Sequence, residues 1–364
     1  MRLSLTLSAY IGRQFFVWFL GVFLAFAAIL LLFDTLELLR RAASKPDATF
    51  PIVFKMALFK LPHMAQLLVP FAVLFGGMLA FWRLTRSHEL VVARAAGVSV
   101  WQFLLPSVLG ALIIGLLKIG LFNPMASVML VRYAQLESLY LHGQPSALAV
   151  SPSGFWLREF GPKGVTLVHG LGVAPSEARL TVATVFQFDL NHRFTGRIDA
   201  AEATLLDGQW RFREAWVAGP ERSAEHHALL TIPTTMTWAK IEDSFAPPET
   251  LSVWDLYGFI GTLETAGFSA IRHRQYFHAL LAGPLLLCAM VLIAATFSLR
   301  PSRRGGVGYM VIGGVVAGFL LYITSDFVSA LGLSGYIPVV LAAWTPAGVS
   351  TLLGVATLFH LEDG

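Results

Sequence analysis

The sequence has few charged residues and a single cysteine, and both shortages restrict the class of protein. Charged residues make up 13% of the 364 positions and hydrophobic residues 56%, with a mean hydropathy of +0.67. Soluble domains carry about 25% charged residues, so we expect most of this chain to lie in lipid. Cys288 lies within an apolar run, which excludes a disulfide within the chain and gives no indication of a thiol metal site.

The motifs of common catalytic sites are also missing. The chain has no G-x-x-x-x-G-K-[ST] phosphate loop, no H-E-x-x-H, no G-x-S-x-G and no C-x-x-C. His226 and His227 are adjacent in a predicted strand, so their rings point to opposite faces and cannot share a metal ion. The net charge of +4 is modest, and the arginines are scattered at segment ends. We therefore predict no catalytic residue, no metal site, no cofactor held by this chain and no nucleic-acid partner.

Long apolar runs and one alternating region define the expected architecture. Six runs are long enough to cross a bilayer, which takes about 20 apolar residues. They lie near 11–39, 53–82, 100–123, 276–298, 308–330 and 337–359. In the fifth run Gly314-x-x-x-Gly318, and in the first Gly21-x-x-x-Ala25, are spacings that allow close helix packing, although the pattern also recurs by chance.

Between the third and fourth runs, apolar and polar residues alternate with period two, as at 185–190 and 210–213. Asp207-Gly208 separates two such runs and is a strong hairpin signal. The sequence therefore predicts an α-helical polytopic membrane protein with six spans and an inserted all-β domain, either a jelly roll or an open sandwich. We expect helices and a surface helix in 1–139, the β-domain in 140–250, and a connector and three helices in 251–364.

The distribution of Lys and Arg predicts the orientation. Eight arginines fall on one side if both termini are cytoplasmic, which places residues 83–99 inside and the β-domain in the periplasm. They are Arg2, Arg13, Arg83, Arg86, Arg94, Arg300, Arg303 and Arg304. Several bases nevertheless lie toward the outer side: Arg40, Arg41, Lys55, Lys60, Lys118, Arg272 and Arg274. Such residues oppose the orientation bias, so we interpret them as a candidate site for an anionic lipid head group. The alternative is that the intramembrane charges Asp34, Lys60 and Asp326 pair with one another or reach the interface.

The stretch 83–99, RLTRSHELVVARAAGVS, is the one compact, charge-bearing helical segment between the second and third spans. Ser87 is a candidate helix cap, Glu89 lies in the first turn, and Gly97 is placed to end the helix. Ser99 and Gln102 have the spacing of a capping box that opens the third span. We expect Arg86, Glu89 and Arg94 to share an exposed side with Leu90, Val91 and Val92. That side suits docking of a soluble partner, and the alternative is an ordinary connecting helix.

Three stretches resemble the lipopolysaccharide export permeases of the LptF/LptG (YjgP/YjgQ) family. The run from Leu61 to Ser99, with its core ELVVARAAGVS, is similar to that family's coupling segment. The strand start at 154–158, GFWLR, is similar to the opening of the family's β-jellyroll, and the segments 319–323 and 335–338 are similar to its C-terminal part. The layout of three spans, a β-domain and three spans matches along essentially the whole chain. GYIP at 335–338 and the Gly-x-Trp strand are closer to the LptG branch.

The resemblance implies a function and a set of partners. A permease of this family works with a paralogous LptF-type permease and two copies of an LptB-type ATPase, which binds the ATP and Mg²⁺. It extracts lipopolysaccharide from the inner membrane and passes it through the β-jellyrolls and an LptC-type protein to a periplasmic bridge. Residues 87–97 would be the coupling helix, including Ser87, Glu89, Leu90, Arg94 and Gly97. The predicted head-group residues are Arg40, Arg41, Lys60, Lys118, Arg272 and Arg274.

The β-domain and the first span raise two further points under this resemblance. Phe186, Phe188, Trp210 and Phe212 would line a path for acyl chains, although in a closed domain they would be ordinary core. The family leads us to expect a lysine in the outer half of the first span, where this chain has Phe33 and Asp34.

Two functions of other classes stay open from the residues. One is a secondary transporter with Asp34, Lys60 and Asp326 as an ion relay, although no internal repeat links the two three-span halves. The other is a membrane scaffold that displays a β-domain.

Overall fold

The computed structural model describes residues 5–362 except 46, 96, 143–147, 152–153, 162–163, 175–178, 190–192, 207, 221, 235, 238–240, 242–245, 266–267 and 300–305. The chain divides into two compact units. The first comprises Met1–His142, Glu249–Trp254 and Arg274–Gly364, and the second comprises Gly143–Pro248 and Asp255–His273. We call them the helical unit and the β unit.

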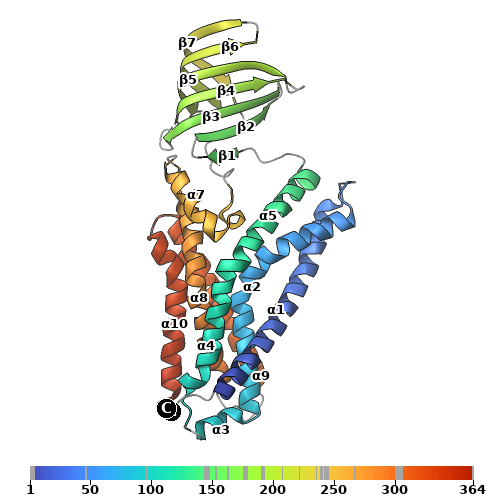
Figure 1. Cartoon of the computed structure of the whole chain (residues 1–364), viewed down its shortest axis with the longest axis vertical. Coiled ribbons are helices and arrows are strands. Elements are labelled where there is room, and N and C mark those ends of the chain that lie inside the picture. Colours follow the sequence, from blue (N-terminus) through green and yellow to red (C-terminus); the bar gives the residue numbers. More distant parts are fainter. Residues whose placement is uncertain are drawn as a thin grey trace. The chain divides into compact units, whose positions relative to one another are not determined.

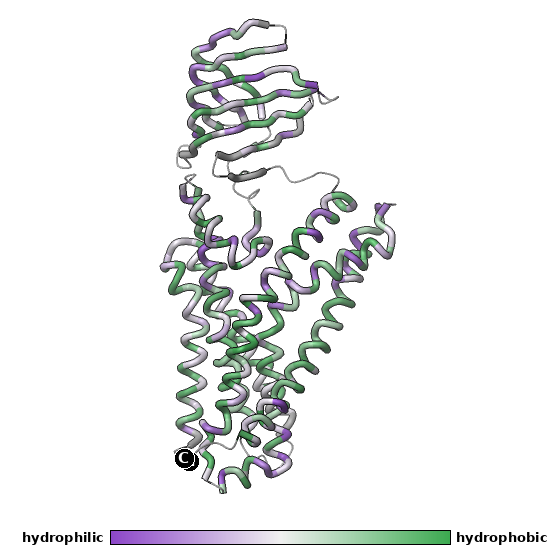
Figure 2. Tube along the Cα trace, in the orientation of Figure 1, coloured by the Kyte–Doolittle hydropathy of each residue, from purple (hydrophilic) through white to green (hydrophobic). Residues whose placement is uncertain are grey.

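Six helices in the described chain are long and apolar enough to span a membrane, which confirms the predicted number (Figure 1). They are α1 (Leu5–Ala42), α2 (Phe50–Arg86), the segment Val100–Leu141, α8 (Ile271–Ser298), α9 (Gly306–Leu333) and α10 (Val339–Glu362). The hydropathy colours in Figure 2 show the apolar residues that run along these helices.

The third span is longer than its predicted range of 100–123. It continues from α4 (Val100–Leu117) through the π-helix η1 (Lys118–Phe122) into α5 (Asn123–Glu137) and the π-helix η2 (Ser138–His142). Pro124 has no backbone N–H and its ring crowds the preceding turn, which would end many helices. The wider π-turn just before it accommodates this defect, so the helix continues past the proline.

Small residues let the helices of the helical unit approach closely. A Cβ atom built on Gly76 of α2 would lie 2.6 Å from Cα of Phe19 in α1. A Cβ atom on Gly314 of α9 would lie 2.6 Å from Sδ of Met78, and one on Gly318 would lie 3.2 Å from the Phe71 ring. The predicted close packing at the Gly314–Gly318 spacing is therefore present, between α9 and α2. In the described part of the chain, no atom of another segment lies within 4 Å of the Cβ position of Gly21, so the corresponding spacing in α1 is not a packing contact there.

The β unit contains one antiparallel sheet whose seven described strands follow chain order. The strands are β1 (Leu148–Ser151), β2 (Gly154–Gly161), β3 (Gly164–Ala174), β4 (Arg179–Phe188), β5 (Phe194–Leu206), β6 (Gln209–Gly219) and β7 (Arg222–Pro233). Leu206 pairs with Gln209, and Gly208 has φ 72°, so the predicted two-residue hairpin is confirmed, while Asp207 lies outside the described residues. The inserted all-β domain is confirmed, but the described strands have neither the crossed order of a jelly roll nor the second sheet of a sandwich. A short η4 (Pro248–Thr250) and α7 (Val253–Thr265) follow the sheet.

The alternation of buried and exposed side chains is interrupted once in β4 and once in β6. In β4 Leu180 and Ala183 are buried, so Thr181 and Val182 both face outward. In β6 two exposed residues likewise lie between the buried Phe212 and Ala215. The second residue of each exposed pair has a positive φ, 50° at Val182 and 52° at Glu214. Beyond each interruption the period-two pattern is shifted by one residue.

Candidate functional site

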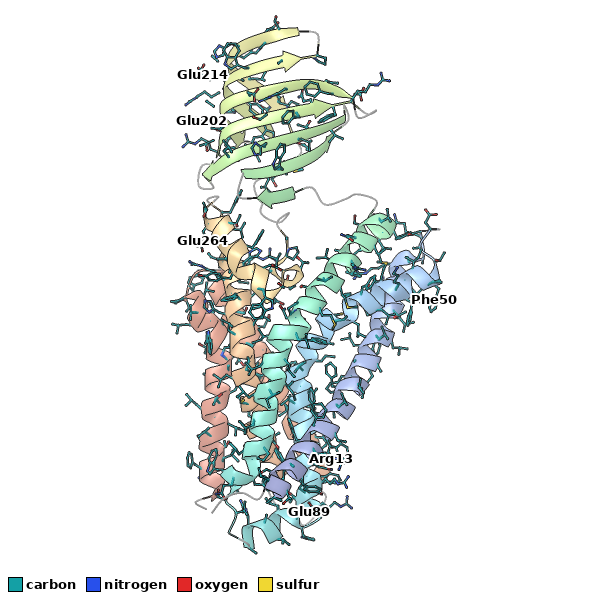
Figure 3. All side chains as sticks on the ribbon, in the orientation of Figure 1. Arg13, Phe50, Glu89, Glu202, Glu214 and Glu264 are labelled. Carbon is teal, nitrogen blue, oxygen red and sulfur yellow. The ribbon has the colours of Figure 1, made fainter. Side chains whose placement is uncertain are left out.

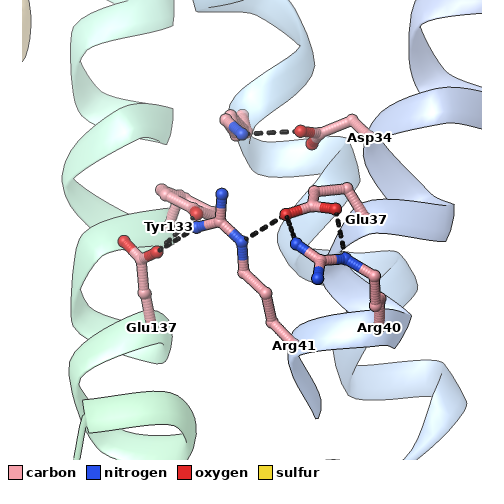
Figure 4. A network of polar contacts seen from close by, with 7 residues as sticks. Asp34, Glu37, Arg40, Arg41, Tyr133 and Glu137 are labelled. Carbon is pink, nitrogen blue, oxygen red and sulfur yellow. Dashed lines mark hydrogen bonds and ion pairs between the residues drawn. The ribbon is translucent and has the colours of Figure 1, made fainter. Parts of the chain in front are cut away.

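Charged side chains gather near the C-terminal end of α1 (Figure 4). Glu37 receives two hydrogen bonds from Arg40, from Nε to Oε2 and from Nη2 to Oε1, each 2.8 Å long. Arg41 Nε donates a third, 2.9 Å long, to Glu37 Oε1. The spacing in sequence explains this arrangement, because residues three and four apart are neighbours on a helix surface. Both arginines remain accessible, with side chains 76% and 49% exposed.

Helices α2 and α5 complete this group. Lys60 of α2 donates a 2.6 Å hydrogen bond from Nζ to Oδ1 of Asp34 in α1, and the same amino group lies 5.4 Å from the centre of the Tyr133 ring. Tyr133 of α5 donates a 2.8 Å hydrogen bond from its hydroxyl to Glu137, whose carboxylate lies 3.9 Å from Nη1 of Arg41. We call these seven residues the charge network: Asp34, Glu37, Arg40, Arg41, Lys60, Tyr133 and Glu137.

An apolar groove leads along α1 and α2 to the charge network. One part, about 750 Å³, lies between α1, α2 and α9, and a second, about 630 Å³, lies between α1 and α2. The two parts share Phe26, Phe71 and Phe75. The second part is apolar along most of its length but also includes Asp34 and Glu37. The groove therefore offers an apolar surface with charged side chains at one end, which suits an amphipathic ligand.

The short helix α3 (Glu89–Ala95) lies at the other end of the helical unit. In Figure 3 Glu89 and Arg13 are labelled at one end of the α1–α2 pair, and Phe50 is labelled at the opposite end. Glu89 Oε1 accepts hydrogen bonds from Oγ of Ser87 at 2.8 Å and from the hydroxyl of Tyr10 at 3.3 Å. These bonds hold the carboxylate in place and leave Oε2 without a partner among the described residues.

The predicted boundaries of α3 are correct at one end only. Gly97 has φ 82°, and the hydrogen bonds Gly97 N–H to Arg94 O and Val98 N–H to Ala93 O form the expected helix end. The predicted capping box of Ser99 and Gln102 is also present. We expected Ser87 to cap the start of α3, and this prediction is wrong. It is the C-cap of α2, and its hydroxyl donates to Arg83 O at 3.0 Å.

The exposed side of α3 also differs from the expected one. Leu90 is only 4% exposed and belongs to the core of the helical unit, so its predicted place on the docking side is wrong. Arg94 and Arg86 are exposed, and Val92 is 68% exposed. The side chain of Val91 is outside the described set. Of the residues expected on the docking side, Arg86, Arg94 and Val92 are therefore exposed and Glu89 is half-buried, while Leu90 anchors the helix from beneath.

The four aromatic residues predicted to line a path in the β-domain lie on two faces of the sheet. Trp210 and Phe212 are buried at 2% and 1% exposure. Phe186 alternates with the buried Val185, so it faces the other way, where it stacks on Trp156 with ring centres 6.2 Å apart. Phe188 lies on that same outer face and contacts the Phe194 ring. A single lining made of all four side chains is therefore wrong, because the interruption of β4 at Val182 shifts the alternation.

Comparison with known proteins decides the family. A model of the family described as "Lipopolysaccharide export system permease LptF/LptG" matches residues 9–360. The chain belongs to the LptF/LptG permease family. It is 24% identical over 311 residues to the lipopolysaccharide export system permease protein LptG of Escherichia coli K12, covering 83% of this chain and 84% of that protein. It is 23% identical to the Haemophilus influenzae LptG, covering 79% and 80%. As a member of this family with six apolar helices, it is a multi-pass membrane protein.

Within this permease the structure brings together three of the six predicted head-group cations. Arg40, Arg41 and Lys60 all belong to the charge network. Lys118 lies in η1, is half-buried and is not among the residues that line the groove. Arg272 and Arg274 are exposed in the first turn of α8. Lys118, Arg272 and Arg274 are therefore not part of the charge network, and their assignment to the head-group site stays a prediction.

Three members of the charge network, Glu37, Tyr133 and Glu137, were not predicted from the sequence. Glu37 could have been found, because Glu37-x-x-Arg40-Arg41 has the spacing of helical ion pairs. Tyr133 and Glu137 carry no such signal, since only the packing of α5 against α1 and α2 brings them to the arginines. The lysine that the family led us to expect in the outer half of the first span also has a counterpart. Lys60 of α2 places its amino group beside Asp34 at that level of α1.

Proposed function

We propose that this chain is a permease subunit of an ABC transporter that extracts lipopolysaccharide from the inner membrane and passes it to a periplasmic bridge for export to the outer membrane. The observation that carries the proposal is the apolar groove of α1, α2 and α9, which ends at Asp34 and Glu37, where Glu37 pairs with the accessible Arg40 and Arg41. Acyl chains would lie along Phe26, Phe71 and Phe75. Phosphate groups of the same lipid would pair with Arg40 and Arg41, which bind such groups in a bidentate manner.

The groove would contribute mainly shape and van der Waals contact. Acyl chains that leave the bilayer for the groove exchange one apolar environment for another, so the hydrophobic effect adds little to their binding. The charged end then selects the lipid and sets its height in the membrane. Because both arginines are exposed, each contact would be modest, and the two would act jointly.

We assign the energy source to a partner. The chain has no phosphate loop, so ATP and Mg²⁺ would be bound by an LptB-type ATPase dimer, and this chain would itself hold no cofactor and catalyse no reaction. α3 would seat in a groove of that ATPase and receive its motion. The fixed Glu89 carboxylate, whose Oε2 has no partner among the described residues, and the exposed Arg94 support this role. The further partners would be a paralogous LptF-type permease and an LptC-type periplasmic membrane protein.

The orientation follows from the same assignment. A cytoplasmic ATPase requires α3 to face the cytoplasm, and the charge network at the other end of α1 and α2 would then lie toward the periplasm. Both termini would be cytoplasmic and the β unit periplasmic. The arginines of the second loop, Arg83, Arg86 and Arg94, are consistent with this orientation.

Co-purification of the ATPase tests the proposal. The membrane-extracted complex is expected to retain the ATPase, and Glu89→Arg is expected to release it, because reversing a buried interfacial charge costs about 2–5 kcal/mol. Glu225→Arg makes the same charge reversal on the exposed β7 strand and serves as the control. If the ATPase remains bound and is normally stimulated by Glu89→Arg, α3 is not the coupling element.

A further inference from the structure

The two arginines assigned to the head group already hold an anion, and that anion is part of the protein. Glu37 accepts three hydrogen bonds of 2.8–2.9 Å, two from Arg40 and one from Arg41 (Figure 4). Fork-to-fork pairing of this kind is the geometry in which arginine also binds a phosphate. The Nε donors of both arginines are therefore occupied in the empty protein. A phosphate that pairs through the Nε edge of either guanidinium group needs the same donors.

The exchange is chemically possible because the internal pairing is weak. Glu37 lies three and four residues before its partners, and its side chain is 37% exposed. Pairs of this type on an exposed helix surface contribute little to stability, since water screens them. A phosphate monoester carries about 1.5–2 negative charges and three acceptor oxygens, against one charge and two oxygens for the carboxylate. The phosphate is therefore the stronger partner for two adjacent guanidinium groups.

Glu37 also lies where a lipid in the groove would meet the arginines. It lines the same part of the groove as Asp34, whose charge is compensated by Lys60. On its other side, Arg41 is held near Glu137, which itself receives the Tyr133 hydroxyl. Arg41 is thus kept near α5 by Glu137, while Glu37 is the acceptor that can move away.

We propose that Glu37 is an internal competitor for the phosphate groups of the lipid. This inference rests on the proposed function. In the empty protein Glu37 neutralises Arg40 and Arg41, and a phosphate-bearing lipid binds by displacing it. A lipid without phosphate gains nothing from the exchange and is left with the groove alone. Glu37 thereby lowers the affinity for the bound lipid, which favours its onward release, and confines the electrostatic gain to lipids of high negative charge.

Replacement of Glu37 by glutamine tests the competition. The measured quantity is the affinity of the purified complex in detergent for lipopolysaccharide and for the same lipid after enzymatic removal of its phosphates. Glu37→Gln is expected to bind the phosphorylated lipid about fivefold more tightly, equivalent to about 1 kcal/mol, with no change for the dephosphorylated lipid. Its lipid-stimulated ATPase rate is expected to fall, because release becomes slower.

Asp47→Asn is the matched control. Asp47 is an exposed residue shortly after α1, and its carboxylate has no partner in the part of the chain that the structure describes. Its replacement removes the same charge without freeing the arginines and is expected to leave both affinities unchanged. Unchanged or weaker binding by Glu37→Gln, or an equal gain with both lipids, would overturn the competition.

A third variant separates this inference from the proposed function. Arg40→Glu with Arg41→Glu removes the cations themselves and is expected to weaken binding of the phosphorylated lipid at least tenfold. If this double variant binds normally, the head-group site of the proposed function is wrong. If it loses binding while Glu37→Gln resembles the native protein, the site stands and only the competition is wrong.

Discussion

Asp34 and Lys60 form the least exposed ion pair among the described residues of the helical unit, with side chains 9% and 21% exposed. The pair joins α1 to α2 within spans that lie in lipid, where an unpaired charge is expensive. Asp34 Oδ2 is buried and makes no hydrogen bond to any residue that the structure describes, so one of the two carboxylate oxygens lacks a partner there. The sequence left open whether the three intramembrane charges pair with one another, and two of them do. The third, Asp326, is exposed on α9.

A double-mutant cycle at this pair separates a structural role from an ion relay. Asp34→Asn or Lys60→Met alone is expected to destabilise the purified chain by about 3 kcal/mol, because each leaves its partner charged and unpaired. The double variant is expected to recover most of this loss in a thermal unfolding measurement in detergent. It is expected to retain ATP-driven transport at a lower rate, because Lys60 is also a predicted head-group cation. A double variant that is stable but inactive would favour the relay of a secondary transporter.

Charges are informative in this sequence because their surroundings are apolar. Arg40, Arg41 and Lys60 could be selected from the sequence for that reason, and the structure places them in one network. Leu90 shows the limit of the same reasoning, because a leucine on a short amphipathic helix can face the core or the partner. Its 4% exposure is decided by packing against the helical unit, which no local pattern reports.

At the scale of elements, glycine contacts determine how closely α1 and α2 approach. We expect Gly76→Ala to destabilise the protein by about 1–3 kcal/mol, because the new methyl group would overlap the backbone of Phe19, with distances of 2.6 Å to Cα and 2.8 Å to N. The control is Gly21→Ala, a site with nothing within 4 Å, where the better helix propensity of alanine is expected to give no loss or a gain of up to about 1 kcal/mol. Thermal unfolding in detergent compares the two. Equal destabilisation would contradict this account of the α1–α2 contact.

More could be predicted from the sequence about the helices than about the strands. The six spans follow from length and apolarity, and the start of α4 follows from the Ser99 capping box. The start of α3 did not follow, because α2 continues to Arg86 and takes Ser87 as its C-cap. In the β unit, period two identified strands but not which side chains face inward. A β-branched residue at positive φ, as at Val182, is too unusual to be expected from sequence, and it moves Phe186 and Phe188 to the outer face.

At the scale of the whole molecule, the family places this chain among lipopolysaccharide export permeases. Its candidate functional features occupy different parts of the helical unit. α3 lies at one end of α1 and α2, the charge network lies at the other, and the apolar groove runs between them. A motion imposed on α3 would therefore reach the groove through α2, which is continuous from Phe50 to Arg86. The same layout fits a scaffold less well, because a scaffold needs neither the groove nor accessible arginines beside it.

The central claim is that ATP hydrolysis by a partner drives removal of the lipid through this chain. The most direct measurement is the release of lipopolysaccharide from proteoliposomes that contain the chain together with the proposed partners: a paralogous permease, an LptB-type ATPase and an LptC-type protein. Release is scored with ATP alone, with a proton gradient alone, and with ATP in the Glu89→Arg complex. We predict release with ATP, no release with the gradient, and loss of at least nine-tenths of the ATP-driven release in the Glu89→Arg complex. Release driven by the gradient without ATP, or undiminished release by the Glu89→Arg complex, would contradict the account.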